Sequence, residues 1–176
     1  MSAPATARLR LFFALWPDAA VRERLAAYAR GAHARCGGRA TRPQNLHLTL
    51  AFLGDTEAAR LGALMAVAAT VAPRRFELDV DHVEYWRRNR IVWAGAAAVP
   101  DELTSLTGEL RAALDAAGFR YDRKPFVPHV TLLRDAHPAA LPPFEPLRWP
   151  AEGFVLVRSE AGRDYAVDRE WRVTTG

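Results

Sequence analysis

The sequence predicts an α+β fold made of two similar halves, on three observations. Short apolar runs typical of strands alternate with longer segments of helical periodicity. Both halves place an apolar run, a Pro-Asp pair, a helix and a His-x-Thr element in the same order. The aspartates of the Pro-Asp pairs, Asp18 and Asp101, are 83 residues apart, and the histidines His47 and His129 are 82 apart. We therefore expect an internal duplication, in which the two halves pack about a pseudo-two-fold axis with a cleft between them.

The predicted elements of the first half follow from apolar runs and breakers. Leu9–Trp16 predicts a buried strand that ends at Pro17. Asp18 suits a helix N-cap, and the helix behind it carries apolar residues at helical spacing and ends before Gly37. Leu46–Leu53 alternates and predicts a second strand. A helix with its apolar face on Leu61, Leu64, Met65 and Ala68 follows, and is stopped by Pro73.

The second half repeats this order. Its helix runs from Asp101 to Gly118, and the proline-rich segment His137–Pro150 predicts an extended connection with little regular structure. The predicted strands of this half are Phe76–Val83, Arg90–Ala96, Val127–Leu133, Phe154–Arg158 and Tyr165–Val173.

Composition bounds the class of protein. Half of the residues are hydrophobic and a quarter are charged, so the chain can bury a core. The net charge of +4 indicates binding partners only weakly. Lys124 is the one lysine among 24 basic residues, so the others are arginines, whose planar guanidinium group suits phosphate. The single cysteine, Cys36, excludes an intramolecular disulfide framework and a cysteine-rich zinc site, and its Arg-Cys-Gly-Gly setting predicts a loop. No apolar run approaches the roughly 18 residues of a membrane span and no signal-peptide pattern is present, so we expect no membrane association and a cytoplasmic location.

Two His-x-Thr elements carry the chemistry. Alternate side chains of a strand share a face, so His47 and Thr49 are expected to point one way while the flanking leucines point into the core. His129 and Thr131 repeat this arrangement. If a two-fold axis relates the lobes, two imidazoles and two hydroxyls line one cleft.

Such a site suits a cyclic phosphodiester. One neutral and one protonated imidazole supply a general base and a general acid near neutral pH, and threonine hydroxyls donate to phosphate oxygens. Opening the strained ring by this route demands no metal and no cofactor. A zinc site is the weaker interpretation, because neither histidine has a Cys, Asp or Glu at ligand spacing. The sequence also contains no Gly-x-Ser-x-Gly elbow, no Gly-x-Gly-x-x-Gly and no Walker-type loop.

The segments around both histidines resemble the paired signatures of the two-histidine (2H) phosphoesterase superfamily. They are RPQNLHLTLAFLG over residues 42–54 and FVPHVTLLR over residues 126–134. The sequence is most similar to the bacterial RNA 2′,3′-cyclic phosphodiesterase branch, historically called 2′-5′ RNA ligase (LigT-like), which residues 11–15 and 90–93 also resemble. The resemblance covers most of the chain up to Arg134.

The resemblance implies that residues 1–176 form a single bilobal α+β domain, in which each lobe is an antiparallel-rich sheet with outer helices and a central cleft lies between the lobes. It also implies an enzyme that hydrolyses the 2′,3′-cyclic phosphate end of RNA to a 2′-phosphate. It makes His47 the proton donor to the 3′ oxygen and His129 the proton acceptor that activates water, with Thr49 and Thr131 on the phosphate. In a pseudo-symmetric site the roles of acid and base can also be exchanged, and the sequence leaves this open.

Two further residues are candidates for substrate binding. Arg134 stands five residues after His129, and Phe52 stands five residues after His47. A cation suits a phosphate and an aromatic ring suits a stacked base. Strict alternation, however, puts Arg134 on the opposite face of its strand from His129, so a β-bulge or the strand end must intervene.

The other histidines and aromatic residues are assigned to structural roles first. His33 is expected at an exposed helix end and His137 in the proline-rich connection. His82 is expected in a strand with a core or surface role, and a position in the cleft is the alternative. The arginine-rich turn at residues 87–90 is expected to be a solvated loop, with RNA contact as the alternative. Trp86 either stacks on a base or fills the core, while Tyr28 and Trp149 are assigned to packing.

Three functions remain open at this point. The first is the cyclic phosphodiesterase acting on RNA or oligonucleotide ends, as a monomer because one cleft holds the whole site. The second is a module that binds a nucleotide or an RNA end without turnover. The third is 2′-5′ joining of RNA as the main activity.

Overall fold

The computed structural model describes residues 7–174, and its α+β architecture agrees with the predicted fold class. In chain order the elements are β1 (Arg8–Leu15), α1 (Ala19–Cys36), β2 (Arg39–Ala40), η1 (Pro43–Asn45), β3 (Leu48–Glu57), η2 (Ala58–Arg60), α2 (Leu61–Ala68), β4 (Phe76–Val80), β5 (His82–Trp86), β6 (Ile91–Gly95), α3 (Asp101–Ala116), β7 (His129–Arg134), β8 (Leu147–Ala151), β9 (Gly153–Ser159) and β10 (Ala166–Arg172). Within the described part of the chain, no helix is both long and apolar enough to span a bilayer.

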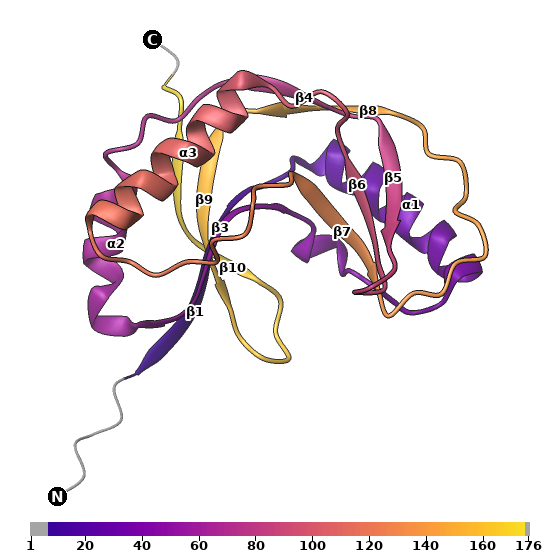
Figure 1. Ribbon diagram of the computed structural model, residues 1–176, viewed down its shortest axis with the longest axis horizontal. Helices are drawn as coiled ribbons and strands as arrows, with labels where there is room; N and C mark the ends of the chain where they lie inside the picture. Colours follow the sequence, from indigo (N-terminus) through magenta and orange to yellow (C-terminus); the bar gives the residue numbers. More distant parts are fainter. Residues whose placement is uncertain (1–6, 175–176) are drawn as a thin grey trace, which may run out of the picture.

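One antiparallel sheet runs through both lobes in the order β10-β9-β1-β3-β7-β6-β5, and β2 pairs with β7 outside this path (Figure 1). The first lobe holds β3, β1, β9 and β10, and the second holds β7, β6 and β5. The two sets of strands join at a single cross-strand pair, Leu48 with Val130. The antiparallel pairs β1·β3 and β6·β7 are equivalent in the two halves, as the duplicated order of elements predicts.

The helices are exchanged between the lobes. α1 follows β1 in the chain, yet it packs against β7, β2 and β8 on the second lobe, and α3 follows β6 yet packs against β3 and α2 on the first (Figure 1). Each half of the chain therefore supplies the helix that covers the other half's strands. Sequence reasoning did not predict this exchange, because the apolar face of a helix does not identify the sheet that it covers.

The exchange produces one core shared by both halves. Its largest buried cluster includes residues of α1, α3, β1, β3, β7, β8 and β9. Asp18 caps α1 as predicted, accepting a hydrogen bond from the backbone N–H of Val21 at 2.8 Å. Trp149 is buried and Tyr28 donates its hydroxyl to the Pro142 carbonyl at 2.8 Å, so both pack as predicted.

Three local predictions were wrong. The single strand predicted over 76–83 is two strands, because the chain changes partner from β8 to β6 at Asp81, whose backbone N–H donates to the Gly95 carbonyl. The segment 137–150 contains β8, since Pro150 is tolerated in a two-stranded ribbon where its missing N–H breaks no central ladder. Cys36 is the buried last residue of α1 rather than part of a loop.

Candidate active site

The two His-x-Thr elements meet at the junction of the lobes. His47 immediately precedes β3, whereas the predicted strand 46–53 included it. His129 is the first residue of β7. Because Leu48 pairs with Val130 in antiparallel register, His47 lies across from Thr131, and Thr49 lies across from His129. Leu48 and Val130 are buried on the core face, so the four polar side chains share the cleft face.

Backbone carbonyls fix both imidazoles in the same way. Nδ1 of His47 lies 2.7 Å from the Asn45 carbonyl, and Nδ1 of His129 lies 2.7 Å from the Val127 carbonyl, two residues upstream in each case. A carbonyl only accepts, so Nδ1 carries the hydrogen, and Nε2 is the nitrogen with the free lone pair in each neutral ring. In neutral His47, Nε2 accepts from the Thr49 hydroxyl at 3.0 Å.

Aromatic rings surround both histidines. The His47 ring lies 4.7 Å from Phe12, 5.5 Å from Tyr165 and 6.1 Å from Trp16, measured between ring centroids. The His129 ring lies 4.7 Å from Trp86 and 6.2 Å from Trp93.

This enclosure determines the protonation of the free site. Burial is the main cause that lowers the pKa of His47 to about 4, with smaller contributions from the charges of His129 and Arg134, against the backbone bond to Asn45. Burial also lowers the pKa of His129, with a smaller contribution from Arg134. Both rings are therefore neutral at pH 7 when the cleft holds no anion.

A β-bulge brings the fifth residue after each histidine to the cleft face. In β7, Thr131 pairs with Trp93 and Leu133 with Val92, so Leu132 is the extra residue. Arg134 is thereby turned to the side of Thr131, and both line one hollow with His47. Of the two possibilities that alternation left for Arg134, a bulge or the strand end, the structure has the bulge.

The equivalent bulge in β3 falls on Leu50, because Thr49 pairs with Ala14 and Ala51 with Phe13. It turns Phe52 to the same face as Thr49, half-buried beside Phe12, with the Arg10 guanidinium 4.8 Å above its ring.

At each bulge, a backbone carbonyl accepts hydrogen bonds from a residue of another part of the chain. The Leu50 carbonyl accepts two bonds of 3.2 Å from the Arg111 guanidinium of α3, and the Leu132 carbonyl accepts from the Thr41 backbone N–H at 2.9 Å. Arg111 and Thr41 thus hold the strands in the register that the site needs. The sequence carries no signal for this role, because it depends on the register of strands far away in the chain.

The hollow beside His47 has a volume of about 190 Å³ and is lined by Arg39, Ala40, Thr41, Arg42, Asn45, His47, Thr131, Arg134 and Tyr165. Arg134 forms no ion pair with any residue in the range 7–174. Arg39, Arg42 and Tyr165 were not predicted; Tyr165 comes from the loop between β9 and β10, whose position depends on tertiary packing.

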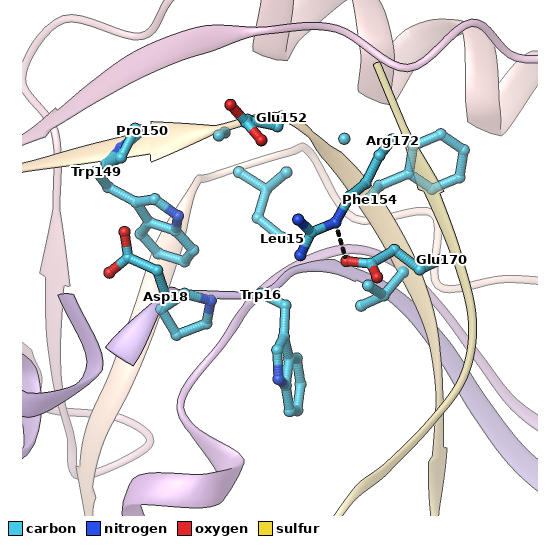
Figure 2. A pocket seen from close by; sticks show the side chains of 13 residues that line it. Leu15, Trp16, Asp18, Trp149, Pro150, Glu152, Phe154, Glu170 and Arg172 are labelled. Carbon is cyan, nitrogen blue, oxygen red and sulfur yellow. Dashed lines mark hydrogen bonds and ion pairs between the residues drawn. The ribbon is translucent and has the colours of Figure 1, made fainter. Parts of the chain in front are cut away.

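A larger hollow of about 300 Å³ lies elsewhere, between the end of β1 and strands β8, β9 and β10 (Figure 2). Trp16 lies at its edge, and the Arg172–Glu170 ion pair, at 2.6 Å, spans its wall. Neither His47 nor His129 lines it. Of these two hollows, the smaller one is lined by residues of the two His-x-Thr elements, His47 and Thr131.

The other predicted residues lie around this centre. His82 is hydrogen-bonded to Asp81 at 2.6 Å and its ring lies 5.5 Å from Trp93, so it borders the wall behind His129. Trp86 is half-buried against Trp93 and His129. The residues of the 87–90 turn are exposed, as is His33, and both agree with their predictions.

Comparison with known proteins identifies the family of the chain. The family model LigT like Phosphoesterase matches residues 15–93 and 95–165. An RNA 2′,3′-cyclic phosphodiesterase of Escherichia coli K12 is 35% identical over 170 residues, covering 94% of this chain and 97% of the relative.

Solved structures give the same result. The structure of E. coli LigT complexed with 3′-AMP is 34% identical with a TM-score of 0.85, covering 96% of this chain and 100% of the other. TT0787 of Thermus thermophilus is 30% identical with a TM-score of 0.75, covering 93% of this chain and 97% of the other.

Fold and cleft together define a two-lobed phosphoesterase with a His-x-Thr element in each lobe. The chain belongs to the LigT-like phosphoesterase family, as its motifs indicated.

The charge of Arg134 reaches both imidazoles, which gives a test of their convergence. Arg134→Gln is expected to raise the pKa of His47 and of His129, because it removes a positive charge that opposes protonation of each ring. NMR titration of the imidazole C–H signals measures both values. Arg30→Gln, an exposed change on α1, serves as the control, and a shift at one ring alone would contradict the shared site.

Proposed function

We propose that this protein is an RNA 2′,3′-cyclic phosphodiesterase that opens the cyclic phosphate end of RNA to a 2′-phosphate by two-histidine acid–base catalysis. The observation that carries the proposal is the antiparallel pairing of Leu48 with Val130, which puts both His-x-Thr elements on one face. Relatives named for this activity, at up to 35% identity over most of the chain, support it.

In the proposed step, Nε2 of His129 takes a proton from a water molecule as the water oxygen attacks phosphorus. The bond between phosphorus and the 3′ oxygen breaks, and Nε2 of protonated His47 gives its proton to that oxygen. One water is consumed, and the product carries a 2′-phosphate and a 3′-hydroxyl. The tether at Nδ1 of each ring supports these roles, because it leaves Nε2 free for proton transfer. The scheme uses no metal ion.

Thr49, Thr131 and Arg134 are proposed to bind the phosphate. The hydroxyls donate to its oxygens, and the guanidinium supplies a charge that no carboxylate of residues 7–174 neutralises. Phe52 is proposed to stack on the terminal base, since its ring shares the cleft face with His47.

We propose that binding of the substrate leads to protonation of His47, the general acid. Both rings favour the neutral form in the free protein, and a bound phosphodiester anion raises the pKa of each. When His47 is protonated, the Thr49 hydroxyl no longer donates to Nε2 and is free to donate to phosphate. Since one chain supplies both histidines, we propose that residues 1–176 act as one bilobal unit and as a monomer.

Hydrolysis of an oligonucleotide ending in a 2′,3′-cyclic phosphate, assayed with EDTA present, tests the function. The wild-type protein is expected to release the 2′-phosphate product, whereas His47→Gln and His129→Gln each lower kcat/KM by at least about 100-fold, the usual contribution of a general acid or base. His33→Gln, an exposed histidine of α1, is the matched control. Tight binding of the oligonucleotide without turnover would instead support a binding module.

The pH profile follows from the two lowered pKa values. The active form carries one proton on the two imidazoles. In the free protein that proton lies mainly on His129, and the form with His47 protonated and His129 neutral is the minor one, but the two forms rise and fall together with pH. Below about pH 4 both rings are protonated and no base remains, and above the pKa of His129 both rings are neutral and no acid remains. We expect kcat/KM on a cyclic mononucleotide to form a bell with both limbs below 6.5, and kcat to have limbs at higher pH because the anion is bound. Two kcat/KM limbs above pH 7 would contradict this assignment.

A further inference from the structure

More arginines line the hollow beside His47 than one phosphate needs. Arg39, Arg42 and Arg134 all line its 190 Å³ volume. Arg134 adjoins Thr131 and lies close enough to both imidazoles to lower the pKa of each, whereas neither Arg39 nor Arg42 has this effect. The hollow therefore has one arginine whose charge reaches the imidazoles and two outer arginines. Arg39 lies in β2, paired with Arg134 of β7, and Arg42 lies between β2 and η1.

The two outer arginines are free to turn towards a ligand. Arg39 lies 2.8 Å from Asp135, but Asp135 also pairs with Arg90 at 3.1 Å, so the carboxylate keeps a partner when Arg39 leaves. Arg42 pairs with Asp164 at 3.0 Å. Both guanidinium side chains are largely exposed, at 76% and 61%, so these ion pairs are weak in water.

A second anion explains this arrangement better than the terminal phosphate does. The cyclic phosphate carries a single charge, and Arg134 with a protonated imidazole already balances it. Two more guanidinium groups at the same phosphate would oppose protonation of His47, which the acid role requires. The walls of the hollow also include Tyr165 and Ala40, which suit the apolar faces of a sugar.

We propose, on the basis of the function above, that Arg39 and Arg42 bind the phosphodiester that joins the terminal nucleotide of the substrate to the one before it. The substrate class is then an RNA strand, at least a dinucleotide, rather than a free cyclic mononucleotide. The loop between β9 and β10 forms part of this subsite, since Tyr165 lines it and its backbone N–H donates to the Asn45 side chain at 2.8 Å.

The test compares three substrates that end in the same 2′,3′-cyclic phosphate: a mononucleotide, a dinucleotide, and a dinucleotide whose internal linkage is a neutral methylphosphonate. Wild-type kcat/KM is expected to be about tenfold higher for the charged dinucleotide than for the neutral one, the value of one charge-assisted contact. Arg39→Gln combined with Arg42→Gln removes that difference. It lowers kcat/KM far more for the charged dinucleotide than for the mononucleotide.

The controls separate this inference from the function on which it rests. Arg30→Gln keeps the wild-type preference, because Arg30 is exposed on α1 away from the hollow. If the double variant loses equal activity on all three substrates, or if wild type does not distinguish the neutral linkage, the subsite is wrong while the phosphodiesterase stands. If wild type hydrolyses none of the three, the proposed function fails and the subsite fails with it.

Discussion

Leu48 and Val130 form the single backbone pair between β3 and β7, and the arrangement of the cleft depends on it. An antiparallel pair fixes its neighbours in both directions, so the residues on either side of Leu48 face those on either side of Val130. These neighbours are His47, Thr49, His129 and Thr131. Both central side chains are buried, and slipping one strand by one residue would turn the histidine and threonine of that strand into the core, away from the pair on the other strand.

The exchange of helices stabilises this narrow junction. α1 and α3 each pack on the strands of the other half, so the lobes share one hydrophobic core although a single pair joins their strands. Because this packing is buried, opening the cleft costs more than breaking one pair of hydrogen bonds. The ribbon of β4 and β8 adds a second connection, since each of these strands leads from one lobe to the other (Figure 1).

Local patterns in the sequence predicted much of this molecule. Alternation placed His47 with Thr49 and His129 with Thr131, and the matched spacing predicted the duplication. Alternation also showed that Arg134 requires a bulge or the strand end to change face, and the structure has a bulge at Leu132. The bulge itself was beyond prediction, because it is stabilised by Thr41, about 90 residues away along the chain.

The rest of the fold could not be predicted, because the sequence does not show which strands pair with one another. The apolar alternation of Phe76, Leu78 and Val80 does not show that the chain leaves β8 and joins β6 at Asp81. For the same reason, no sequence pattern places Tyr165 beside His47, since the loop between β9 and β10 reaches the cleft through the order of strands in the sheet.

The central claim is that two imidazoles converge on one anion. A crystal structure of the protein with inorganic phosphate tests it most directly. The account predicts one phosphate whose oxygens lie within hydrogen-bond distance, about 2.7–3.2 Å, of Nε2 of both His47 and His129. A phosphate held by one histidine while the other ring lies out of reach, or two phosphates at separate histidines, would contradict it.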